Sequence, residues 1–137
     1  MPLELKKVGS APHHELMTAD DDDILVVVPD PGFKDNVEAS RQTVACLRAY
    51  AQGLGRRCGL VVVANNLLAQ EPESRRIYAE QVSPDLFYGI TMVVSNRMAR
   101  AIGHVALRFT KMPIPFGLSE DVESGIAWMR LHRKAVE

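Results

Sequence analysis

Three runs of consecutive apolar residues, rich in valine, constrain most strongly how this chain folds. They are ILVVVPD at 24–30, GLVVVANN at 59–66 and YGITMVVSN at 88–96. A strand that is apolar on both faces is typical of a central strand that helices cover from both sides. Each run is followed by residues with helical spacing. This alternation predicts parallel strands joined by right-handed crossovers.

The stretches that follow the strands carry the end signals of α-helices. We predict helices at 34–54, from Pro72 to Val82, at 97–110 and from Ser119 to Lys134. Asp35 or Asn36 is the expected cap of the first helix, and Gly53 and Gly55 are its expected end. The helix at 97–110 has large apolar residues three and four positions apart, the spacing of a face packed on a core. These residues are Met98, Ile102, Val105 and Phe109.

The remaining strands are expected at the edges of the sheet. PIPFGL, at 113–118, contains two prolines, which suit an edge strand because proline cannot donate a ladder hydrogen bond. Residues 1–23 are expected to form a peripheral β segment, with candidate strands in LELKKV and HHELMT. Asp20 to Asp23 repel one another and favour a solvated turn. The predicted fold is α/β, one domain over 1–137 with a single mixed, mostly parallel sheet of about five strands covered by about four helices.

Composition excludes several classes of function. The formal net charge is −1, from 16 Lys and Arg against 17 Asp and Glu, so no strong field favours nucleic acid. The apolar runs are far shorter than the roughly 18 residues of a membrane span, and the N-terminus lacks the apolar core of a signal peptide. We therefore expect a cytoplasmic protein without membrane insertion. Cys46 and Cys58 are expected to be a buried, reduced pair, with a disulfide or metal pair as the alternative.

Polar residues follow each of the three apolar runs. They are Asp30, Asn65, Asn66, Ser95, Asn96 and Arg97. Ligands of open α/β sheets gather at the carboxyl ends of the strands, and a helix N-terminus at 95–97 offers free N–H groups to an anion. The sequence therefore predicts a polar mouth for a ligand or a partner. The alternative is that these side chains only cap the helix and its loop.

No catalytic motif is present. The chain lacks a nucleophile elbow, a P-loop and a G-x-G-x-x-G loop, so we expect no catalytic residue and no cofactor. His13 and His14 are adjacent, and adjacent strand residues point to opposite sides, so no metal site is expected. Arg75 and Arg76 lie among glutamates and are interpreted as a solvated helix face, with phosphate or partner recognition as the alternative.

Several segments of the chain resemble the STAS-like superfamily. The resemblance runs from Ile24 to Leu131. It rests on VVSNRMARAIGHVALRF at 93–109, KMPIPFGL at 111–118 and SEDVESGIAWM at 119–129. More closely, the chain is similar to small bacterial proteins described as STAS/SEC14-like, or as similar to the sporulation anti-anti-sigma factor. The resemblance implies a mainly parallel sheet surrounded by helices.

The resemblance also implies a role in protein–protein switching. In anti-sigma antagonists a phosphorylatable serine follows the strand that matches LVVVA, but here Asn65 and Asn66 occupy that place and no hydroxyl follows until Ser74. The kinase-controlled switch is therefore not carried over. We expect a non-enzymatic regulatory or protein-interaction domain whose partner is another protein or a second copy in a homodimer. The alternative is a carrier of a small apolar ligand or lipid, of the CRAL-TRIO type.

Overall fold

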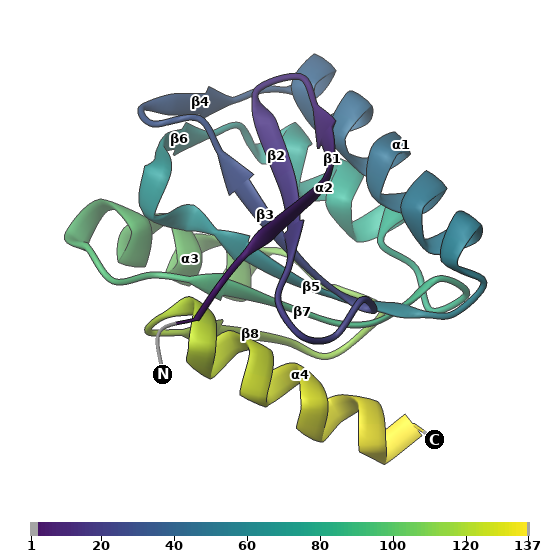
Figure 1. The fold of residues 1–137 in the computed structure, drawn as a ribbon. Helices are drawn as coiled ribbons and strands as arrows, with labels where there is room; N and C mark the ends of the chain where they lie inside the picture. The colour runs from purple at the N-terminus through teal and green to yellow at the C-terminus, as the bar shows by residue number, and fades with distance from the viewer. Residues whose placement is uncertain (1–2, 137) are drawn as a thin grey trace.

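The computed structural model describes residues 3–136, with side chains through Lys134, and has an α/β fold (Figure 1). The strands are β1 (Lys6–Ala11), β2 (His14–Thr18), β3 (Ile24–Pro29), β4 (Phe33–Asp35), β5 (Cys58–Val63), β6 (Leu67–Gln70), β7 (Phe87–Val93) and β8 (Phe116–Ser119). The helices are α1 (Val37–Leu54), α2 (Pro72–Gln81), α3 (Arg97–Phe109) and α4 (Val122–Val136), with a short 3₁₀ turn, η1 (Ala64–Asn66).

The main sheet is mixed and has six strands in the order β1-β2-β3-β5-β7-β8. The pairs β1–β2 and β2–β3 are antiparallel, whereas β3–β5, β5–β7 and β7–β8 are parallel. The predicted single mixed sheet with four helices is therefore confirmed, with β8 at one edge and the N-terminal strands at the other. A separate two-stranded parallel sheet, β4–β6, was not predicted.

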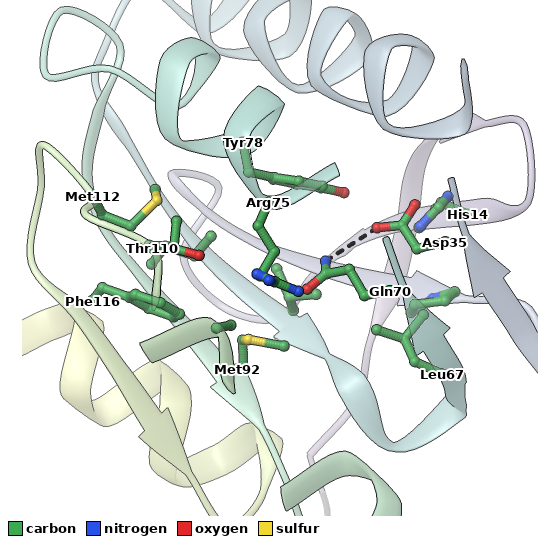
Figure 2. A pocket seen from close by; sticks show the side chains of 14 residues that line it. His14, Asp35, Leu67, Gln70, Arg75, Tyr78, Met92, Thr110, Met112 and Phe116 are labelled. Atoms are coloured by element: carbon green, nitrogen blue, oxygen red, sulfur yellow. Dashed lines mark hydrogen bonds between the residues drawn. The ribbon is translucent and has the colours of Figure 1, made fainter. Parts of the chain in front are cut away.

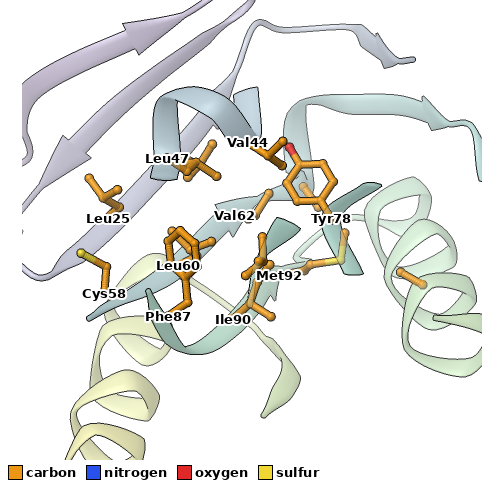
Figure 3. Close-up of a cluster of buried hydrophobic side chains, with 14 of the residues drawn as sticks. Leu25, Val44, Leu47, Cys58, Leu60, Val62, Tyr78, Phe87, Ile90 and Met92 are labelled. Atoms are coloured by element: carbon orange, nitrogen blue, oxygen red, sulfur yellow. The ribbon is translucent and has the colours of Figure 1, made fainter. Parts of the chain in front are cut away.

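The central strands bury both of their faces. In β3, Leu25 and Val27 belong to the larger cluster of buried side chains, whereas Ile24 and Val26 belong to a second cluster. Figure 3 shows the larger cluster, to which α1, α2 and α3 contribute side chains. The second cluster lies on the opposite face and is closed by Ile126 of α4. Alternation along each strand thus forces helices onto both faces of the sheet.

The last helix begins at Val122 and not at Ser119, which ends β8, and the first two strand–helix units also differ from the prediction in their boundaries. Asn36 caps α1, because its side chain accepts a hydrogen bond from the Ala39 N–H at 2.9 Å, so the helix begins at Val37 and not at 34. The residues before this cap extend into β4. The strand predicted at 59–66 ends at Val63, because the chain turns through η1 and then pairs with β4 as β6.

The aspartate run is not simply a solvated turn, and this prediction was wrong for Asp23. The Asp23 side chain is buried, accepts a hydrogen bond from the Tyr88 hydroxyl at 3.1 Å, and pairs with Arg133 at 2.8 Å. Arg130 donates to Asp21 at 2.6 Å. A buried carboxylate requires such partners. The run therefore ties the β2–β3 turn to α4 and holds that helix against the sheet.

The prediction for the core face of α3 was wrong. The side chains that α3 buries are the small ones, Ala99, Gly103 and Ala106. A Cβ on Gly103 would lie 2.9 Å from Val94 Cγ1 and 3.1 Å from Leu118 Cδ2, so α3 approaches β7 and β8 too closely for larger residues. Close approach of the helix backbone thus selects the small-residue face, although the large residues have the more apolar pattern.

Both cysteines are free thiols. Cys58 is buried at the start of β5, and burial, followed by the negative charge of Asp23, raises the pKa of its thiol to about 12. The thiol therefore stays protonated near neutral pH and behaves as a small apolar side chain.

The close contact at Gly103 makes a prediction about stability. We expect Gly103→Leu to lower the free energy of unfolding by about 1–3 kcal/mol, because the added side chain overpacks the contact with Val94 and Leu118. Gly53 is the matched control, since it lies inside α1 with no atom within 4 Å of an added Cβ. Gly53→Ala should raise the same free energy by roughly 0.5–1 kcal/mol. Urea unfolding measures both, and wild-type stability of Gly103→Leu would contradict the packing described.

Candidate functional site

The polar residues predicted to form a mouth are brought together at the carboxyl ends of β3, β5 and β7. The Asn65 side chain accepts from the Ser95 N–H at 2.7 Å, and the Asn96 side chain donates to the Asn65 carbonyl at 2.9 Å. Asn96 also caps α3 by accepting from the Ala99 N–H at 2.7 Å. These side chains therefore connect the loop after β5 to the start of α3.

The other half of this group connects β5 to β3. Asn66 donates to the Pro29 carbonyl at 2.7 Å, and its own carbonyl accepts from the Gly32 N–H at 2.9 Å. Asp30 is exposed and lies 3.5 Å from the ring of His13. Arg97 is exposed at the first position of α3. The amides are thus engaged in joining loops, and none of the six predicted residues lines the hollows described below.

A cavity lies between the main sheet, the β4–β6 sheet, α2 and α3 (Figure 2). Its walls include Val62, Ile90 and Met92 from the sheet, and its volume is about 40 Å³. Such a volume holds only a few water molecules and is far below the roughly 300 Å³ at which ligand pockets begin. The cavity therefore gives no support to the alternative of a ligand or lipid carrier.

One end of this cavity is polar. Asp35 is buried and accepts hydrogen bonds from Ser40 at 3.0 Å and from Gln70 Nε2 at 3.1 Å. Burial raises the pKa of the Asp35 carboxyl, although both hydrogen bonds act in the opposite direction. Among the described residues, the Gln70 Oε1 atom has no hydrogen-bond partner. Nearby His14 is also buried and lies 3.1 Å from the Thr43 hydroxyl.

The helix α3 exposes several large apolar side chains. Because α3 buries its small residues, its large apolar residues remain in contact with solvent. Phe109 is 69% exposed, Met98 50% and Val105 41%, while Ile102 is half-buried. We call these four residues the α3 stripe. Single exposed apolar residues are ordinary, but several on one helix face make that face a candidate binding surface.

The α3 stripe borders a groove between α3 and α2. Ile102 and Val105 line a hollow of about 200 Å³ with Gln70 and Arg75. Phe109 lines the next hollow, of about 360 Å³, again with Arg75. Arg75 also lines the small buried cavity, so it stands where the three hollows meet. Figure 2 shows its side chain extending toward Gln70.

The sequence indicated part of this site. The sequence predicts a solvated helix face for Arg75, with phosphate or partner recognition as the alternative. The structure places Arg76 on such a face, paired with Glu73 at 3.3 Å, whereas Arg75 is half-buried and lines the groove. The sequence pattern also shows the apolar row of the α3 stripe, but it predicts that this row packs on the core. The small residues Ala99 and Gly103 were the signal for the opposite orientation.

Comparisons with known proteins leave the site to be interpreted from its own chemistry. No family model matches the chain, and neither the curated proteins nor the solved structures contain a match. Over residues 3–136, no helix has both the length and the apolar character needed to cross a membrane.

Asp35 makes a prediction about pH. A raised pKa in the folded state means that proton binding favours folding, so Asp35 destabilises the protein as the pH rises above its ordinary pKa of 3.8. Asp35→Asn removes the buried charge. The introduced amide can donate to Gln70 Oε1 once the Gln70 side-chain amide flips, which exchanges the positions of its oxygen and nitrogen. We expect the substitution to raise the free energy of unfolding at pH 7 by roughly 1 kcal/mol.

The gain should shrink toward zero below pH 3.8. Chemical denaturation from pH 3 to pH 7 measures the difference, with the exposed Glu80→Gln as a control that should leave stability nearly unchanged at every pH. A loss of stability at pH 7 on Asp35→Asn would show that the carboxylate stabilises the fold.

Proposed function

We propose that this chain is a non-enzymatic regulatory domain of the STAS-like kind, which acts in the cytoplasm by binding another protein through the α3 stripe. The observation that carries the proposal is the orientation of α3, which presents Met98, Val105 and Phe109 to solvent. An exposed row of large apolar side chains is retained at a cost in solubility, and binding to a partner removes that cost.

Two further observations favour binding over chemistry. In the described part of the chain, the two buried carboxylates have structural partners, Asp23 with Arg133 and Asp35 with Ser40. The amides at the carboxyl ends of the strands join loops, as with Asn65 and the Ser95 N–H.

The free thiols agree with a reducing compartment. Asn65 and Asn66 stand where anti-sigma antagonists carry a phosphorylatable serine. A constitutive interaction surface is therefore the simpler role.

Site-specific photo-crosslinking in the cells that produce the protein tests the proposal. A photoreactive phenylalanine analogue is placed at Val105 in the α3 stripe or, as a matched control, at Ala49, an exposed position of α1. We expect a discrete covalent adduct from position 105 and none from position 49. The mass of the adduct distinguishes a second copy from another protein.

A variant of the stripe makes the test specific. Phe109→Ser should lower the adduct yield from position 105 about tenfold, since truncating an interface anchor costs about 1–2 kcal/mol. The melting temperature should change little, because the side chain is mostly exposed. Equal labelling from positions 105 and 49, or labelling that Phe109→Ser leaves intact, would contradict the proposal.

A further inference from the structure

The α3 stripe has the spacing of a coiled-coil seam. Its residues, Met98, Ile102, Val105 and Phe109, follow one another at intervals of four, three and four positions. This is the spacing of alternating d and a positions of a heptad, whose knobs fit between the side chains of a facing helix. The shape of the stripe therefore matches another helix better than an extended strand.

The surface beside the stripe is concave. α2 forms the opposite wall, where Pro72 and Ala79 line the same hollow as Phe109. A helix can lie in a groove between two helices, whereas a flat bilayer reaches only the rims of a groove. The occupant that fits this shape is a segment of protein chain.

The charge around the groove is positive on balance, because Glu73 in its wall is already paired with Arg76 at 3.3 Å. Arg75 and Lys111 line the groove, and the Arg108 guanidinium lies 5.5 Å from the centroid of the Phe109 ring in the stripe. None of them has an ion-pair partner within the part of the chain that the structure describes. α3 itself contains three arginines and no acidic residue. This concentration is local, since the whole chain has a net charge of only −1.

Arg75 has a special place among these cations. It is half-buried, lines both hollows of the groove, and lies on the wall opposite Ile102 and Val105. A guanidinium that is partly desolvated and free of a carboxylate gains more from a new ion pair than an exposed one does. Arginines in such positions are frequent anchors of protein interfaces.

We propose that the partner segment is an acidic amphipathic helix, which lies in the α2–α3 groove with its apolar face on the α3 stripe and a carboxylate on Arg75. This inference rests on the proposed function and names the chemistry of the partner. A second copy of α3 is the less favourable occupant, because it would bring three arginines against three others.

Two synthetic peptides test the inference against the full chain. Both have about 14 residues with leucine at heptad a and d positions. One carries glutamate at the flanking positions and the other carries lysine at the same places. We expect the acidic peptide to bind at least about tenfold more tightly by fluorescence anisotropy, and we expect its affinity to fall between about 50 and 300 mM salt.

Charge variants identify the anchor. Arg75→Gln combined with Lys111→Gln should weaken binding of the acidic peptide about tenfold, because both residues line the groove. The matched control is Arg41→Gln with Arg57→Gln, an equal change of charge at two exposed positions away from α3, which should weaken binding less than about twofold. Thermal unfolding confirms that each variant is folded.

The outcomes separate this inference from the function on which it rests. If Phe109→Ser abolishes binding of both peptides equally and the charge variants have no effect, the apolar surface stands and the acidic partner is overturned. If Phe109→Ser leaves binding of the acidic peptide intact, the proposed function fails. Tighter binding to phosphatidylglycerol vesicles than to the acidic peptide also overturns the acidic helix. A dimer in light scattering that Phe109→Ser converts to a monomer does the same.

Discussion

Burial of the central strands on both faces is the constraint on which the rest of this structure depends. In β3 and β5, neighbouring side chains such as Leu60 and Val61 enter different apolar clusters on opposite sides of the sheet. Each fully buried aliphatic side chain contributes about 1.5–3 kcal/mol, so neither face can be left to solvent. Three helices cover one face and α4 covers the other, so Asp23, the carboxylate that pairs with Arg133 of α4, is itself buried.

Those contacts show how charge is used to close the fold. Asp23 is surrounded by Tyr88 and Arg133, so the β2–β3 turn, β7 and the C-terminal helix meet at one carboxylate. At the opposite ends of the strands, Asn65, Asn66 and Asn96 join the loops through backbone groups. Both ends of the sheet are thus stabilised by specific polar networks, and three of the side chains predicted to form a binding mouth, those of the asparagines, have structural roles.

The orientation of α3 links the fold to the proposed function. A close approach to β7 and β8 requires small side chains, which Ala99, Gly103 and Ala106 supply. The α3 stripe then faces α2 and solvent, beside Arg75 and Lys111, which have no ion-pair partner among the described residues. The same packing that completes the core therefore creates the surface that we assign to a partner, and Arg75 from the neighbouring helix completes its charge.

The sequence by itself determined the order along the chain of the helices and of the strands of the main sheet. Runs of β-branched residues and helical spacing are local signals, so they can be identified without the tertiary structure. It also limited the cap of α1 to Asp35 or Asn36 and predicted the edge position of β8, which depend on local chemistry. The β4–β6 pair, the partners of Asp23 and the buried face of α3 were decided only by the tertiary structure. Each of these depends on contacts between residues far apart in the chain. In α3, two faces were apolar enough to be buried, and the distance between the helix and the sheet selected the smaller side chains.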